Sequence, residues 1–116
     1  MHAEITEWRQ DFHKNPELLY DTVRTSQIVS EKLSSFGCDL VKTGIGRTGV
    51  VAVIKGRSDT KGKVIGLRAD MDALPIKEIT NLEYSSKNDG IMHACGHDGH
   101  TAMLLGAAKY LSETRN

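Results

Sequence analysis

Apolar residues recur every three or four positions in two stretches of the first 37 residues, a pattern typical of helices that bury one face. In the first stretch these residues are Ile5, Trp8 and Phe12. This helix is expected to end at Asn15-Pro16, because proline disfavours a helical residue before it. In the second stretch they are Val23, Val29, Leu33 and Phe36. The second helix is expected to begin at Asp21 or Thr22, both good N-terminal caps, and to end before Gly37.

The pattern then changes to that of strands. Residues 38–42 are predicted to form a short strand, and residues 50–55, which are rich in β-branched side chains, a stronger one. Residues 56–62 are polar and are expected to form a turn. Residues 64–67 are nearly continuous in apolar side chains, which predicts a third strand that is buried on both faces.

A final helix is predicted from about His100 to Ser112, where apolar residues again follow helical spacing. The loop before it, residues 68–98, is long for a compact domain, and loops of this length are usually functional. The order of the elements predicts an α/β fold in which helices pack on a mixed sheet.

Composition narrows the class of protein. The 116 residues include 15 Lys and Arg and 15 Asp and Glu, so the formal net charge is zero, and a nucleic-acid partner, which needs a basic excess, is not expected. No apolar run approaches the roughly 20 residues of a membrane span, and no secretory signal is visible. Two cysteines are too few for a disulfide scaffold, which favours a reducing compartment. We therefore expect a cytoplasmic domain with no membrane partner.

Residues 93–100 hold the densest candidate chemistry: His93, Cys95, His97, Asp98 and His100. Cys95 and His97 are two positions apart, so in an extended segment both can face one ion. Thiolate with imidazole suits zinc and other transition ions. Asp98 can orient a ligand histidine or cap the helix that follows. The alternative is a helix entrance that happens to be rich in histidine.

Two aspartates follow directly after the predicted third strand. Asp70 and Asp72 alternate along the chain, and sites in open α/β sheets gather beyond the carboxyl ends of strands. They are therefore candidates for binding a metal ion or for orienting its ligands. The alternative is a solvated strand end with ordinary charges.

Other features are expected to be structural. Residues 44–49 match G-x-G-x-x-G, but a strand follows them where a dinucleotide site needs a helix, so a glycine-rich connection between strands is favoured. His13, at the end of the first helix, is expected to be solvated or to favour the helix dipole, with no catalytic role. Cys38 is expected to be a buried, inert thiol. The aromatic residues expected in the core are Trp8, Phe12 and Phe36.

Four segments in this order resemble the start of a metal-dependent amidohydrolase: residues 12–18, 44–50, 66–76 and 92–102. The family is that of the aminoacylase/carboxypeptidase G-like metallopeptidases, in the branch of the hippurate, auxin-conjugate and N-acetyl-diaminopimelate hydrolases. The resemblance implies a zinc-exopeptidase-type α/β catalytic domain with an inserted dimerisation domain, and a homo-oligomer. It also implies hydrolysis of N-acyl amino acids with two divalent ions, which are manganese, zinc, cobalt or nickel.

The resemblance also assigns roles to residues. Cys95 and His97 match the first two metal ligands of the branch, and Asp72 matches the carboxylate that supports the metal cluster, which makes it the candidate catalytic residue. Asp70 stands where other branches place a ligand histidine. His93, Asp98 and His100 are expected to support the site.

Residues 1–116 are expected to be the N-terminal part of the catalytic domain, without its remainder and without the dimerisation domain. The family's base glutamate and its other metal ligands lie downstream of the Cys95–His97 segment. The chain by itself is therefore expected to be inactive. The alternative is a truncated, non-catalytic module that binds metal or another protein.

Overall fold

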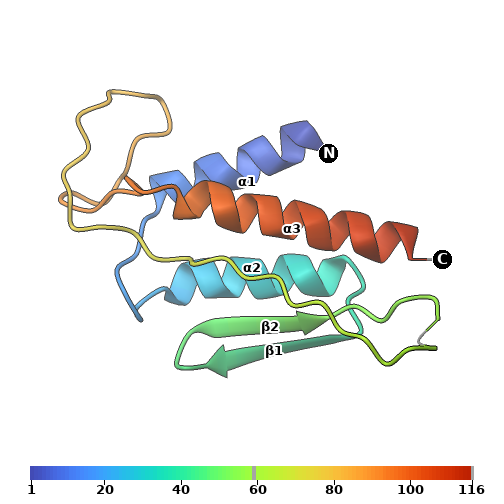
Figure 1. Ribbon diagram of the computed structural model, residues 1–116. Helices are drawn as coiled ribbons and strands as arrows, with labels where there is room; N and C mark the ends of the chain where they lie inside the picture. The colour runs from blue at the N-terminus through green and yellow to red at the C-terminus, as the bar shows by residue number, and fades with distance from the viewer. Residues whose placement is uncertain (59, 116) are drawn as a thin grey trace.

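The computed structural model describes residues 1–58 and 60–115, and its elements form layers (Figure 1). In chain order they are α1 (His2–Lys14), α2 (Val23–Ser35), β1 (Leu40–Ile45), β2 (Gly49–Val53) and α3 (His97–Thr114). Helix α3 packs between α1 and α2, and α2 packs on the β1–β2 hairpin. None of the helices within the described ranges is long and apolar enough to cross a membrane.

Both N-terminal helices form where the apolar spacing predicts them. The core that they share with α3 consists of Phe12, Val29, Leu33, Ala102 and Leu105. Trp8 and Phe36 pack against this core with their ring centroids 5.7 Å apart, so the predicted aromatic core is confirmed. Cys38, in contrast, is only half-buried, and its thiol lies 3.8 Å from the Ser112 hydroxyl.

The start of α2 is capped by a residue that the sequence did not indicate. Thr22 is the N-cap position, as predicted, but its hydroxyl lies 2.8 Å from that of Thr48 and does not cap the helix. The carboxylate of Glu17 instead accepts hydrogen bonds from the backbone N–H groups of Arg24 and Thr25, at 3.0 and 2.7 Å. These are two of the donors that a helix start leaves unsatisfied.

The two predicted strands form one antiparallel hairpin. Leu40 pairs with Val53 and Ile45 with Gly49, with an irregularity between residues 42 and 45. The G-x-G-x-x-G segment is the connection, as expected, and Gly44 has a φ of +74° that a residue with a Cβ rarely adopts.

The predicted third strand does not form. Val64 and Ile65 are 93% and 86% exposed, and no strand in the described part of the chain pairs with them. Both predictions for this segment, strand and burial, are therefore wrong, and the sheet has two antiparallel strands in place of a mixed set. The predicted turn at residues 56–62 includes Asp59, which lies outside the described residues.

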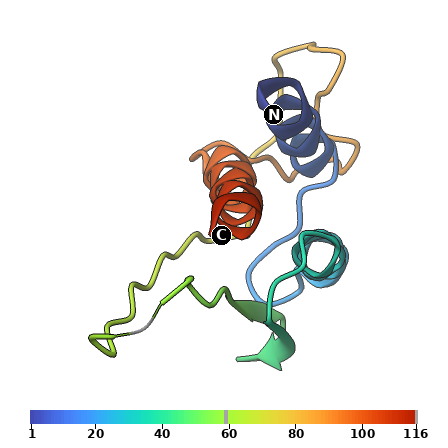
Figure 2. The same cartoon turned by 90° about the vertical axis from the view of Figure 1, so that its right-hand side faces the viewer.

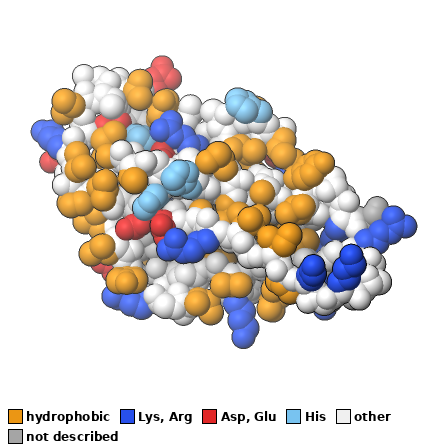
Figure 3. All heavy atoms as spheres, viewed as in Figure 1, with side chains coloured by type: hydrophobic (Ala, Val, Ile, Leu, Met, Phe, Trp, Pro, Cys, Tyr) orange, Lys and Arg blue, Asp and Glu red, His pale blue; other side chains and the backbone are white. Residues whose placement is uncertain are grey.

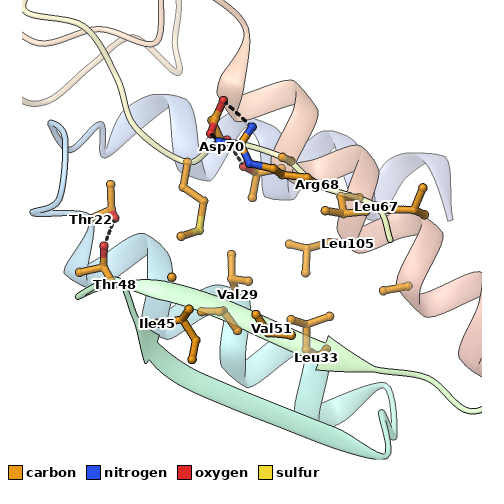
Figure 4. Close-up of a pocket in the computed structure, with 18 of the residues that line it drawn as sticks. Thr22, Val29, Leu33, Ile45, Thr48, Val51, Leu67, Arg68, Asp70 and Leu105 are labelled. Atoms are coloured by element: carbon orange, nitrogen blue, oxygen red, sulfur yellow. Dashed lines mark hydrogen bonds and ion pairs between the residues drawn. The ribbon is translucent and has the colours of Figure 1, made fainter. Parts of the chain in front are cut away.

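An open cavity explains why this segment lacks a partner. Figure 2 shows the chain from about residue 60 to 70 running beside α3 and away from the hairpin. A cavity of about 770 Å³ separates the two, and it is lined by Val51 of β2, Leu67 of the unpaired segment and Leu105 of α3 (Figure 4). A strand needs a neighbouring backbone for its hydrogen bonds, and the nearest one, β2, lies across this space.

The segment between Arg68 and Gly96 forms no helix or longer strand, as expected for the predicted loop. Backbone hydrogen bonds nevertheless attach it to the rest of the protein. Leu74 and Met92 exchange backbone hydrogen bonds of 2.9 and 3.0 Å, and the Ala73 N–H donates to the Glu17 carbonyl at 2.8 Å. These bonds bring the segment that contains Asp72 beside the one that leads to Cys95.

Candidate metal centre

His97 is held by Asp72. His97 is the first residue of α3, and its Nδ1 lies 2.9 Å from the backbone oxygen and 3.0 Å from Oδ1 of Asp72. Both partners are acceptors, so Nδ1 is the nitrogen that carries the hydrogen. In the neutral ring, Nε2 then keeps the lone pair that a metal ion needs.

Asp70 faces the same imidazole from the other side. Its Oδ2 lies 3.9 Å from Nε2 of His97, and its carboxylate also pairs with the Arg68 guanidinium (Figure 4). The Thr101 hydroxyl donates to the Asp70 backbone oxygen at 2.9 Å, which joins this segment to the second turn of α3. The two aspartates are thus brought to the start of α3, and not to the carboxyl end of a third strand, where the sequence analysis expected them.

Cys95 lies just before α3, and its side chain is exposed. The premise that Cys95 and His97 share an extended segment is wrong, because Gly96 between them has a φ of +119° and the helix begins immediately after it. This left-handed turn favours glycine. It sets the thiol outside the helix and the imidazole at its first position.

The surface around His97 carries further polar groups. The rings of His97 and His100 have centroids 5.9 Å apart, and His100 is exposed. Figure 3 shows histidine side chains next to acidic and basic ones on this face. Within residues 1–58 and 60–115, no three His, Cys, Asp or Glu side chains converge closely enough to hold an ion.

The donors nevertheless fit a divalent transition ion in kind. Cys95 offers an accessible thiol, and His97 offers an Nε2 lone pair whose direction is fixed by Asp72. Asp70 adds a carboxylate on the same side. These residues would hold the ion together with ligands from outside the described chain.

The carboxylate of Asp98 makes neither of the two contacts expected for it, and its supporting role at a metal site stays a prediction. Its carboxylate makes no cap for α3, whose N-cap is Gly96, and it points to α1 and not to His97. Arg9 Nε and His13 Nδ1 both donate to its Oδ2 at 2.8 Å. Burial would raise the pKa of Asp98, but these contacts and the Gly99 N–H hold it below its ordinary value.

His13 is the largest departure from the sequence prediction. It is 3% exposed, and not solvated, and its second nitrogen Nε2 lies 3.0 and 3.1 Å from the two carboxylate oxygens of Glu78. Burial would raise the pKa of Glu78, but hydrogen bonds from Thr80, Ser86 and His13 lower it to about 2. Sequence reasoning missed Glu78 and Arg9 as well. The available signal was that Arg9 and His13 are four apart, and so share a helix face beside buried Phe12.

His93 lies inside the protein close to these groups. It is 4% exposed, and neither ring nitrogen has a hydrogen-bond partner among the described residues. Burial holds the pKa of His93 below its ordinary value, so the ring is neutral at neutral pH. Its expected supporting role remains a prediction.

Comparisons with known proteins identify relatives of this chain. The sequence profile of peptidase family M20/M25/M40 matches residues 66–116, which include both site segments. The chain is 54% identical to the hippurate hydrolase of Campylobacter jejuni over 97% of its own length and 28% of that enzyme. It is 49% identical to the N-acyl-L-amino acid amidohydrolase of Geobacillus stearothermophilus, over 98% of this chain and 30% of that protein.

A solved structure matches the fold. The YXEP protein of Bacillus subtilis, described as a dinuclear metal binding peptidase from the M20 family, superposes with a TM-score of 0.92 at 46% identity. The match covers 98% of this chain and 32% of that one. The chain thus spans less than a third of the length of these curated relatives. It belongs to the M20 amidohydrolases, and its residues correspond to the N-terminal portion of such an enzyme.

Proposed function

We propose that this chain forms part of a metal-dependent amidohydrolase that cleaves the amide bond of N-acyl amino acids. The similarity to the hippurate hydrolase and to the N-acyl-L-amino acid amidohydrolase extends over 97% and 98% of the chain and supports this substrate class. The observation that carries the proposal is the contact of His97 Nδ1 with Asp72, since it leaves the opposite nitrogen ready to bind a metal ion.

Each site residue has a stated task in this proposal. Cys95 and His97 are ligands of a pair of divalent ions, which are manganese, zinc, cobalt or nickel. Asp72 holds the Nδ1 hydrogen of His97 and thereby fixes the ring. When bound, such ions polarise a scissile carbonyl and lower the pKa of bound water. The Asp72 carboxylate is occupied by His97, so it supports the ligand and does not serve as the base.

The same proposal places residues 1–116 in the N-terminal part of the catalytic domain. The base, the other metal ligands and a dimerisation domain belong to the rest of a longer, homo-oligomeric enzyme in the cytoplasm. The 116-residue chain by itself is then inactive, because amide hydrolysis with two ions needs both a complete ligand set and a base within hydrogen-bond reach of the water.

The test is turnover of hippurate, an N-acetyl-amino acid and an indole-acetyl-amino acid, with each of the four metals added in turn. We expect metal-dependent hydrolysis of at least one substrate by the complete protein, abolished by EDTA, and none by the 116-residue chain. Hydrolysis that persists in EDTA, or no hydrolysis with any metal, would contradict the proposal.

One observation favours a second candidate, a non-catalytic module. The cavity beside Val51 and Leu67 is open, with apolar side chains next to the charged Arg68 and Asp70, and an exposed apolar surface of this kind can bind another polypeptide. If the complete protein binds metal but cleaves none of these substrates, this candidate replaces the first.

A further inference from the structure

A cluster of four side chains, three of which are buried, joins three distant parts of the chain. Arg9 and His13 come from α1, Glu78 from the loop, and Asp98 from the first turn of α3. His13 is separated from Glu78 by 65 residues and from Asp98 by 85. We define these four residues as the His13 cluster.

His13 must donate from both of its ring nitrogens. Nδ1 lies 2.8 Å from Asp98 and Nε2 lies 3.0 Å from Glu78, and ionised carboxylates only accept hydrogen bonds. The side chains of the three residues are between 2% and 4% exposed, so water does not replace these bonds. The Arg9 guanidinium, whose side chain is 37% exposed, pairs with the same Asp98 carboxylate from the edge of the cluster.

The two carboxylates of the cluster belong to the elements that carry the candidate metal-site residues. Asp98 follows His97 in the first turn of α3. Glu78 accepts the Ser86 N–H at 2.7 Å and the Thr80 hydroxyl, and thereby closes the loop whose ends, at Leu74 and Met92, flank Asp72 and Cys95. His13 therefore ties together the element that carries His97 and the element that carries Asp72.

The Tyr84 ring completes the cluster. The Arg9 guanidinium lies 5.2 Å from the Tyr84 ring centroid, and the His13 ring meets Tyr84 edge-on with centroids 5.6 Å apart. These contacts restrict rotation of both basic side chains. The cluster thus fixes the angle at which α3 meets the loop.

We infer that His13 is a positioning residue for metal binding: through Asp98 and Glu78 it holds His97 in register with Asp72. The expected effect of His13 on catalysis depends on the proposed function, whereas the contacts of His13 with Asp98 and Glu78 do not. Replacing a residue that hydrogen-bonds to a metal ligand typically weakens metal affinity or activity by about 10- to 100-fold. Since His13 acts through Asp98, we expect about tenfold.

The experiment compares Co²⁺ affinity, followed by optical absorption, in the complete wild-type protein and three variants. His13→Gln leaves Glu78 without its charged partner, and we expect about tenfold weaker Co²⁺ binding. In His13→Gln/Glu78→Gln the unpaired charge is gone and the amide oxygen can still accept from Ser86, but the contact of His13 with Asp98 is still missing, so Co²⁺ binding should stay about tenfold weaker than in the wild type. Leu33→Ala, at the far end of α2, controls for lost stability, because it opens a core cavity and should leave Co²⁺ affinity unchanged.

Equal Co²⁺ affinity in wild type and His13→Gln would overturn the inference, and so would an equal loss in Leu33→Ala. If His13→Gln does not fold, the double variant decides: weakened binding in that protein supports the inference, and near-wild-type binding contradicts it. Amide hydrogen exchange in the second turn of α3, whose N–H groups bond to the carbonyls of the first turn, gives a metal-free measure, and it should accelerate in His13→Gln but not in Leu33→Ala. Should the wild type bind no Co²⁺, the proposed function fails, whereas the exchange result still decides the role of His13.

Discussion

The Nδ1 atom of His97 lies 3.0 Å from Oδ1 of Asp72, although 25 residues separate them in the sequence. A carboxylate behind an imidazole selects the tautomer, fixes the ring and raises the basicity of the opposite nitrogen. This pair is formed within the described chain, before any other part of a longer enzyme contributes. Under the proposed function, this chain therefore presents the candidate ligand His97 already oriented.

The first prediction concerns this pair. Asp72→Asn should weaken metal binding by the complete protein by about 10- to 100-fold, because the amide carries no charge to hold the Nδ1 hydrogen. Isothermal titration with Zn²⁺ or Mn²⁺ measures the change. Asp89→Asn is the matched control, since Asp89 is exposed in the loop. Unchanged affinity in Asp72→Asn would show that Asp72 does not support a ligand.

The second prediction concerns the apolar cavity. Val64 and Ile65 are exposed and unpaired, and the edge of β2 across the cavity has unpaired backbone groups, so the 116-residue chain should self-associate and melt without a cooperative transition. Ile65→Lys should reduce this association, because an edge lysine opposes strand pairing. Lys63→Arg is the control, with no change in charge.

Sedimentation velocity and calorimetry measure this second prediction. A monomeric wild-type chain with a cooperative melting transition would contradict it, as would association that Ile65→Lys leaves unchanged.

The third prediction is a pH dependence of stability. The pKa of Glu78 falls from an ordinary value of 4.5 to about 2 in the folded protein. A lowered folded pKa means that the ionised carboxylate stabilises the fold above about pH 4.5, and that this contribution is lost as the pH falls toward about 2. Glu78→Gln should therefore be less stable than wild type at pH 7, by about 1–3 kcal/mol for the disturbed buried hydrogen bonds. The difference should vanish near pH 2.

Urea denaturation of the complete protein across this pH range measures the effect, and Glu83→Gln, in the same loop and exposed, is the control. A difference between wild type and Glu78→Gln that stays constant from pH 7 to pH 2 would contradict the assigned pKa.

The sequence predicts the local elements well and the long-range ones poorly. The helices around Phe12 and Leu33 follow from apolar spacing within one element, and the hairpin follows from β-branched runs around a glycine-rich connection. The segment at Val64 has the composition of a buried strand, but burial depends on a partner that the described chain does not contain. The composition of a segment indicates that it can form a buried strand, but it does not indicate whether another strand lies beside it.

In the candidate site, too, the residues within short segments were predicted and the contacts between distant segments were not. Asp72 and His97 were predicted because each belongs to a short segment rich in metal-binding residue types. His13 and Glu78 were not, since their contact spans 65 residues and each occupies an ordinary segment. Asp98 was predicted to orient a ligand histidine or to cap the helix that follows, but its carboxylate contacts His13 of α1.

The central claim is that Cys95 and His97 bind divalent metal in the complete protein, and metal content measured by elemental analysis tests it most directly. Cys38→Ser and His2→Ala are the matched controls, since Cys38 contacts Ser112 away from the site and His2 is exposed at the start of α1. The account predicts that Cys95→Ser/His97→Ala lowers the bound metal per chain, whereas both controls keep the wild-type value. The same stoichiometry in the double variant as in the wild type would contradict it.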